Sequence, residues 1–260
     1  MSWNSNRQSK YFFGVLFFIL MVGFLFLRPI LFKEPTCFDT KKNGDETGVD
    51  CGGSCALFCT EEAKNISVKW ARAFKVVDGR YNVAAYIENQ NTDAVVKEIG
   101  YIFKVYDNEN RFIVERVGKT YISASGAMVV FEPGLITGGN REPAFVRFEF
   151  IGEPVWYREP LFAKDVSLVV TEDPEFIDQT TVPKLTATIV NKSFQKPKDV
   201  DVYAVLYDEN ENALAVSKTV LSEIERNSST QANFSWFLPI EGIVVRKEII
   251  TNFDPFINLQ

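Results

Sequence analysis

Four cysteines, all between positions 37 and 59, are the residues with the clearest chemistry in this 260-residue chain. They are Cys37, Cys51, Cys55 and Cys59. An even, clustered set in a glycine-rich stretch predicts two disulfides that crosslink a segment too short to bury a core. A zinc or iron–sulfur site is the alternative, although three-residue gaps between cysteines are unusual for zinc ligands. The spacing leaves the disulfide connectivity open.

Carboxylates in the same stretch offer a second chemistry. Asp39, Asp45, Glu46 and Asp50 lie between the first two cysteines and supply hard oxygen ligands, so a calcium loop is one interpretation. The stretch lacks the ligand spacing of an EF-hand loop. We favour a solvated turn rich in Asx residues, and we expect no cofactor.

Most familiar catalytic machinery is missing from the sequence. The chain has no histidine, which excludes Ser-His-Asp and Cys-His nucleophile pairs, and its net charge of −6 is spread over interspersed acids and bases. A carboxylate pair such as Asp173 and Glu175 would suit glycosidase-like chemistry, but Asp173-Pro174-Glu175 is typical of a linker turn. We therefore expect a protein that is not an enzyme and that binds neither nucleic acid nor a small-molecule substrate.

An apolar segment, residues 11–32, must position everything that follows it. Tyr11 to Leu27 contains no charge and no proline. As a helix the whole segment would reach roughly 33 Å, enough to cross a hydrocarbon core of about 30 Å. We predict an uncleaved signal-anchor in the cell membrane, with the C-terminal side outside the cytoplasm because disulfides need an oxidising compartment. A cleaved signal peptide is the alternative.

Beyond the cysteines the apolar residues recur with a period of two, as in Tyr101–Tyr106. Short similarities also recur about one hundred residues apart and in the same order, for example Tyr106-Asp107 and Tyr207-Asp208. The predicted fold class is all-β, with two tandem immunoglobulin-like β-sandwiches. The predicted parts are a cytoplasmic tail (1–10), a transmembrane anchor (11–32), a cysteine-rich segment (33–62) and two β-sandwich domains (64–158 and 162–260).

Two sets of residues resemble known families. One set resembles the C-x-D…NGDE…DCGG-x-C module of bacterial cell-surface proteins and consists of Cys37-Phe38-Asp39, the run from Asn43 to Gly48, Asp50-Cys51-Gly52-Gly53, Cys55 and Cys59. Leu206-Tyr207-Asp208, with Val105-Tyr106-Asp107 in the first copy, resembles the core of the FxLYD and late-embryogenesis-abundant-like β-sandwich families. The resemblances imply a bacterial envelope location and a β-sandwich fold, and the cysteine module carries no agreed activity.

The first β domain has a longer late hairpin region, residues 123–143, that the second lacks. It combines Met128, Val130 and Phe131 with several glycines and with Arg141, which predicts a loop that presents apolar side chains to a partner. Its Pro133-Gly134 predicts a turn. We favour the other interpretation, an ordinary core strand, Ala127 to Phe131, followed by a long hairpin connection.

Trp70, Trp156 and Trp236 are of the residue type that stacks on sugars, but each lies in or just after an expected strand, where tryptophan is typical of the core. The expected function is non-enzymatic protein binding, or an envelope scaffold, by a single-pass membrane protein. One alternative is an accessory subunit or sensor of a secretion or pilus-like envelope complex. A carbohydrate-binding or hydrolytic surface protein is a further alternative.

Overall fold

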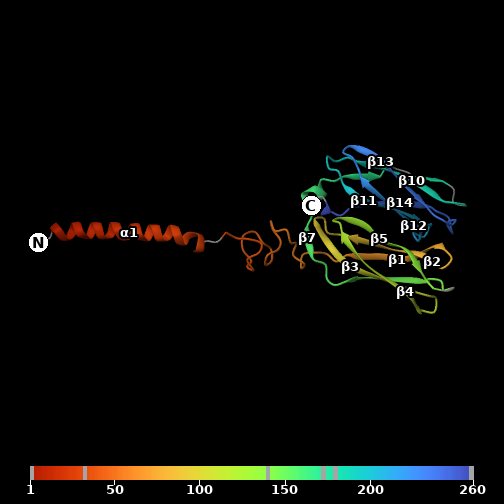
Figure 1. Ribbon diagram of the computed structural model, residues 1–260, viewed down its shortest axis with the longest axis horizontal. Helices are drawn as coiled ribbons and strands as arrows, with labels where there is room; N and C mark the ends of the chain where they lie inside the picture. Colours follow the sequence, from red (N-terminus) through yellow and green to blue (C-terminus); the bar gives the residue numbers. More distant parts are fainter. Residues whose placement is uncertain (1–2, 32–33, 139–140, 171–173, 178–180, 258–260) are drawn as a thin grey trace. The chain divides into compact units, whose positions relative to one another are not determined.

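The computed structural model describes residues 3–31, 34–138, 141–170, 174–177 and 181–257. The chain divides into two compact units, residues 1–55 and 56–260. The first unit begins with helix α1, Trp3–Leu31 (Figure 1). Its stretch Ser9–Arg28 is 20 residues long and apolar enough to cross a membrane. A membrane anchor and a signal sequence both have this character. The helix therefore supports the prediction of an N-terminal membrane-targeting segment, which the two interpretations share.

The rest of the first unit consists of turns and bends, residues 34–55. A disulfide joins Cys37 to Cys55 across 18 positions of sequence. Cys51 and Cys59 are disulfide-bonded as well, and no cysteine in the described part of the chain is free. The prediction of two disulfides is therefore confirmed, and these cysteines offer no thiolate to a zinc ion or an iron–sulfur cluster.

The first seven strands of the second unit form two antiparallel sheets, which together we name sandwich 1. One sheet has the order β1-β2-β5 and the other the order β4-β3-β6, with β7 also paired to β3. The second half of the central strand β3 alternates, because Tyr101, Phe103 and Val105 are buried while Ile102 and Lys104 are only partly covered. The strands are β1 (Ser67–Val77), β2 (Arg80–Asn89), β3 (Ala94–Tyr106), β4 (Phe112–Ile122), β5 (Gly126–Ile136), β6 (Phe145–Ile151) and β7 (Trp156–Arg158).

Sandwich 2 follows a short helix, α2 (Leu161–Lys164), and has the same strand order. Its sheets are β13-β10-β8, with β9 paired to β10, and β12-β11-β14. They correspond in turn to β5-β2-β1 and β4-β3-β6 of sandwich 1. Both predicted immunoglobulin-like sandwiches are thus present. The strands are β8 (Leu168–Val170), β9 (Glu175–Ile177), β10 (Lys184–Asn191), β11 (Lys198–Tyr207), β12 (Ala213–Glu223), β13 (Ser228–Ser235) and β14 (Arg246–Asn252).

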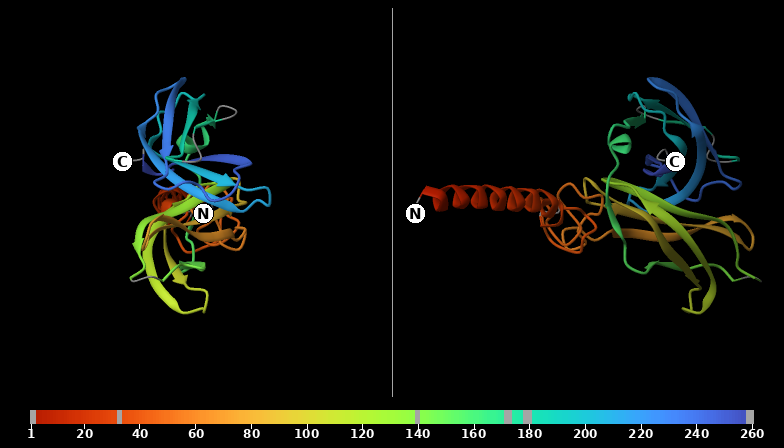
Figure 2. Two further views of the ribbon diagram at one scale, coloured as in Figure 1. Left: turned by 90° about the vertical axis from the view of Figure 1, so that its right-hand side faces the viewer. Right: turned by 60° about the vertical axis from the view of Figure 1, so that its left-hand side comes forward.

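Each sandwich has its own apolar core, and a third apolar core joins them. The third core lies between the outer face of β1-β2-β5 and the outer face of β12-β11-β14, and we name it the inter-sandwich core. Figures 1 and 2 show the two sandwiches side by side, with sandwich 1 drawn from orange to green and sandwich 2 from teal to blue. The buried members of the inter-sandwich core are Phe74, Ala84, Val129, Tyr203, Val205, Tyr207, Ala213, Val216 and Ile250.

Two buried asparagines at equivalent places explain part of the internal similarity. Asn89 ends β2 and donates from its amide nitrogen to the carbonyl oxygens of Ala94 and Ser123 at 2.9 and 2.8 Å. Asn191 ends β10 and donates in the same way to carbonyls of the following loop and of the segment after β12. Each asparagine thereby satisfies backbone groups of two connections that no strand could pair.

Two aspartates account for the recurring Tyr-Asp. The Asp107 carboxylate accepts hydrogen bonds from the backbone nitrogens of Glu109 and Arg111, and Asp208 accepts from those of Asn210 and Asn212. Each aspartate closes the hairpin after the central strand of its sheet. These backbone hydrogen bonds are the main cause that lowers the pKa of both carboxyls below the usual range.

Candidate functional site

The carboxylates of the cysteine-rich segment are engaged with backbone N–H groups. Asp50 accepts from the backbone nitrogens of Asp39 and Thr40 at 3.0 and 3.1 Å. Glu46 accepts from those of Asn43 and Asp50 at 3.2 and 3.3 Å. Each carboxylate thereby satisfies backbone N–H groups of a tight turn, as in an Asx-rich turn. The calcium-loop interpretation stays a prediction.

Asp39 and Asp45 accept hydrogen bonds from side chains of the same segment. The Asn43 side-chain amide donates to Asp39 at 2.8 Å and is the main cause that lowers the pKa of the Asp39 carboxyl. Asp45 accepts from the Ser54 hydroxyl at 2.9 Å. Gly53 has φ of +53°, and a Cβ there would lie 2.1 Å from the carbonyl oxygen of Asp45. Gly53 of the Asp-Cys-Gly-Gly run is therefore required by local packing.

We expect calcium to bind the full chain without a saturable site. A site with a dissociation constant of about 0.1 mM would lie within the range of extracellular calcium modules and would give a clear calorimetric titration at millimolar calcium. Isothermal titration of calcium into the detergent-solubilised chain checks this expectation. A saturable heat that disappears in Asp50→Asn would contradict it.

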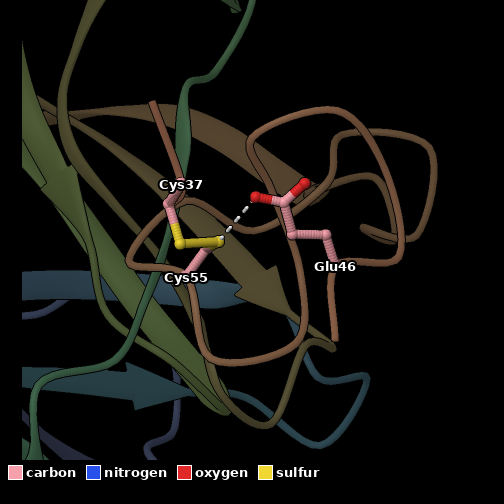
Figure 3. Close-up of side chains that lie close together, drawn as sticks. All are labelled: Cys37, Glu46 and Cys55. Atoms are coloured by element: carbon pink, nitrogen blue, oxygen red, sulfur yellow. Dashed lines mark hydrogen bonds between the residues drawn. A yellow bond between two sulfur atoms is a disulfide. The ribbon is translucent and has the colours of Figure 1, made fainter. Parts of the chain in front are cut away.

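One close group combines two cysteines with an acid. The sulfur atoms of Cys37 and Cys55 and a carboxylate oxygen of Glu46 all lie within 4.8 Å of one another. Figure 3 shows the Glu46 carboxylate pointing at the disulfide, with one oxygen 3.5 Å from the Cys55 sulfur. Because the two sulfurs are bonded to each other, they are not thiolate ligands. The group is a covalent crosslink with a nearby charge and is not a metal centre.

The apolar residues proposed as partner contacts lie in strand β5. Met128 and Val130 are 3% and 4% exposed and belong to the core of sandwich 1, so the folded protein does not present them to a partner. Phe131 packs against the inter-sandwich core. Arg141 is exposed and donates to the backbone carbonyl of Phe112 at 3.1 Å. Met128 to Phe131 are therefore part of a strand, as the core-strand interpretation predicted.

Pro133-Gly134 makes a bulge within β5 and no hairpin turn. The pairing of β2 with β5 shifts between Tyr81 and Val83, opposite these two residues. Gly134 has φ of +70° and donates its N–H to the Asn82 side chain at 2.9 Å. Proline lacks a ladder donor and glycine tolerates positive φ, which is why this pair suits a bulge as well as a turn.

The three tryptophans occupy three separate environments. Trp156 is buried in the core of sandwich 1. Trp70 packs against the inter-sandwich core, with its ring 5.6 Å from that of Tyr86. Trp236 packs against the core of sandwich 2. They do not form one sugar-stacking platform. Of the proposed acid pair, Glu175 lies in β9 and Asp173 lies outside the described residues.

Polar contacts lock the two sandwiches together around the inter-sandwich core. The Arg72 guanidinium donates to the Asn212 side chain at 2.8 Å and to the Ala213 carbonyl. The Tyr86 hydroxyl donates to Glu248 at 2.9 Å, and burial together with that carboxylate raises the pKa of the Tyr86 phenol. Hydrogen bonds of this kind fix the register of two sheet faces that apolar packing alone would leave free to slide.

A groove with a volume of about 960 Å³ opens where the two sandwiches meet. It is lined by residues 71–76 of β1 and 213–218 of β12, which we name the floor, and by residues 143–145 and 235–241. The lining combines small alanines with aromatic side chains. The aromatic lining residues are Phe74, Tyr81, Phe131, Phe145, Trp236 and Phe237.

Both strands of the floor are edges of their sheets. β1 pairs only with β2, and β12 only with β11, among the described strands. The β12 edge is partly closed, because the Thr219 hydroxyl donates to the Asn233 carbonyl of β13 at 2.9 Å. The β1 edge also lies close to a strand of the opposite sheet, β6, with which it forms no ladder. An unpaired edge leaves N–H and C=O groups that a further extended segment can pair with, so both floor strands are candidate templates.

Three cationic side chains and one acidic side chain line the groove. Arg72, Lys75 and Lys218 line it, and Glu241 is the acidic side chain among its lining residues. Lys75 and Lys218 have carboxylate neighbours at 2.8 Å in Asp78 and Asp201. The indole N–H of Trp236, also in the lining, has no acceptor among the described residues. The arrangement suits an extended segment with apolar and acidic side chains.

No protein-family model matches this chain. No curated protein matches it either. Among solved structures, a red sea bream transglutaminase matches 75% of this chain and 30% of its own at 10% identity, with a TM-score of 0.25. A β-glucuronidase from glycoside hydrolase family 2 matches 80% of this chain and 25% of its own at 12% identity, with a TM-score of 0.21. This chain thus spans less than a third of either protein, and likenesses of this size carry no functional argument.

Sequence reasoning missed the groove and the inter-sandwich core. The signal that could have found them is the unbroken apolar run Val202–Tyr207 of β11. Every residue of this run is buried. A strand with one solvent-facing side alternates, as β3 does, whereas an unbroken run indicates burial on both faces.

Proposed function

We propose that this is a non-enzymatic, single-pass membrane protein whose sandwiches lie outside the cytoplasm and bind an extended segment of a protein partner. The groove beside edge strand β1 carries the proposal. It joins an unpaired backbone edge to a lining of apolar side chains, which is the combination that strand addition uses. The apolar helix and the two disulfides support the membrane and extracytoplasmic placement.

We also infer that the two sandwiches are copies of one domain in a bacterial envelope protein. The shared strand order supports duplication. So do the equivalent hydrogen bonds of Asn89 and Asn191, and those of Asp107 and Asp208. Duplication would also explain why the faces of the two sandwiches are related.

Phe237 and Phe194 provide a matched test of the groove, because each is 78% exposed and only Phe237 lines the groove. A photoreactive amino acid replaces Lys75 in the groove of the full chain, which is expressed in the membrane of its own cells. We expect a discrete adduct with another protein. Phe237→Glu is expected to lower that adduct about tenfold, the effect of losing one moderate hot spot of about 1.4 kcal/mol.

Phe194→Glu serves as the control and is expected to leave the adduct unchanged. An equal loss in both variants would mean that the charge acts non-specifically. An adduct that survives Phe237→Glu at full yield would place the partner outside the groove and would overturn the proposal.

A further inference from the structure

The outer face of the sheet β4-β3-β6 carries an exposed aromatic row. Tyr106 lies at its centre, with the Phe145 ring stacked at 5.3 Å and the Phe112 ring edge-on at 6.0 Å. Phe112 and Phe145 are 48% and 44% exposed. Further along the same face lie Val117 of β4 and Ile151 of β6, which are also exposed. A monomer would leave this apolar area open to water.

The equivalent face of sandwich 2 is already an interface within the chain. Tyr207 and Val205 occupy the places in β11 that Tyr106 and Lys104 occupy in β3, and both are buried in the inter-sandwich core. The outer face of β12-β11-β14 is thus covered by sandwich 1. Its counterpart in sandwich 1 is uncovered in the part of the chain that the structure describes.

The contact that joins the two sandwiches within one chain does not fit between two copies of the chain. The cover would have to be the outer face of β13-β10-β8 of another molecule. That face is polar, since the register pairs Thr186 with Asn233 and Thr188 with Gln231. Hydroxyl and amide groups placed against the aromatic row would lose their water without gaining partners. The face of sandwich 1 is better covered by the same face of another copy.

The charges on the face are self-complementary about a two-fold axis parallel to the strands. Lys104 pairs in register with Glu115 of β4 on one side and with Arg147 of β6 on the other. Glu115 and Arg147 form no ion pair among the described residues. Such an axis places β4 of one copy over β6 of the other, so Glu115 faces the partner's Arg147. Lys104 faces Lys104 of the other copy. The Glu149 carboxylate, 3.0 Å from the Lys104 ammonium of the same copy, offsets that positive charge.

The same axis places Phe112 over the partner's Phe145 and Tyr106 over the partner's Tyr106. Aromatic side chains thereby meet aromatic side chains at the centre of a dry row. We propose that two copies of this protein pair through the outer faces of β4-β3-β6, with Glu115 of each copy bound to Arg147 of the other. The interface shares Phe145 with the groove wall, while Tyr106, Phe112, Glu115 and Arg147 lie outside the groove lining.

The area predicts a weak contact. Three strands about 4.8 Å apart and four rows about 6.8 Å apart cover roughly 400 Å² per copy, about half of a standard interface. The pairing should therefore be tested with the full chain at membrane density, where two copies are held at high effective concentration.

Photocrosslinking of two differently tagged full-length copies in the membrane tests the pairing. With the photoreactive residue at Phe112, we expect a homodimer adduct that contains both tags. Glu115→Arg and Arg147→Glu are each expected to lower it at least tenfold, because each places like charges at both contacts. Both residues are exposed, so neither change should affect folding, and an unchanged melting temperature checks this.

Mixing the two variants gives the decisive result. Co-expressed Glu115→Arg and Arg147→Glu copies bear opposite charges at both contacts, so the adduct between them should return to the wild-type yield. Lys184→Glu, an exposed charge reversal on sandwich 2, is the control and should have no effect. A wild-type adduct that contains a different protein, or a mixture that fails to restore the adduct, would overturn the two-fold pairing.

Discussion

Replacing Asn191 with alanine is expected to unfold sandwich 2 at physiological temperature. The Asn191 side chain is fully buried and makes five hydrogen bonds. Its amide nitrogen donates to the carbonyls of Gln195, Ile224 and Glu225 at 2.8, 3.2 and 3.1 Å. Its oxygen accepts from the backbone nitrogen and the hydroxyl of Ser193. Alanine would leave all of these groups without their partner in a space closed to water.

The expected loss is roughly 3–5 kcal/mol in the free energy of unfolding, since each stranded buried group costs about 1–3 kcal/mol. That is a large share of the 5–15 kcal/mol that is typical of a whole protein. Urea unfolding of the detergent-solubilised chain, followed by circular dichroism, measures it. Asn233→Ala is the control, because Asn233 is exposed and accepts one side-chain hydrogen bond from Thr186. A loss below about 1 kcal/mol for Asn191→Ala would show that water replaces the amide.

The sandwich fold could be predicted because most strands alternate between a core face and a wet face. In β3 the run from Tyr101 to Tyr106 places every second residue inward, and the lysine at position 104 shows which face meets water. The aspartates after β3 and β11 predict hairpin turns, because an aspartate carboxylate readily accepts hydrogen bonds from the backbone N–H groups that follow it. The four cysteines predicted their crosslinks for a similar reason, since a short segment without a core needs them.

Contacts between distant faces could not be predicted in the same way. Tyr203, Val205 and Tyr207 look like core residues in sequence, and nothing local says that their cover is another sandwich. The groove depends on how the edges of β1 and β12 come together, which is set by that cover. The partner-binding interpretation of Met128 and Val130 was wrong because glycines nearby suggested a loop, whereas they mark a strand end and a bulge.

Replacing Val205 with aspartate is expected to separate the two sandwiches without unfolding either. The Val205 side chain is fully buried in the inter-sandwich core, on the outer face of β11. Burying an unpaired carboxylate there costs several kcal/mol. The cost disappears once the sandwiches part, because the position then faces water as Lys104 does at the equivalent place in β3. Thermal unfolding of the full chain should change from one cooperative transition to two, and the segment 159–167 should become sensitive to protease.

Ala84→Asp approaches the same contact from sandwich 1, where Ala84 is fully buried on the outer face of β2. If the inter-sandwich core is what couples the two bodies, both variants must give the same pair of transitions. Lys104→Asp, which changes a charge on the uncovered face, should keep the single transition. If each aspartate instead unfolds only the sandwich that carries it, the outer faces belong to the stability of the individual domains, and the coupling between them lies in the hydrogen bonds of Arg72 and Tyr86.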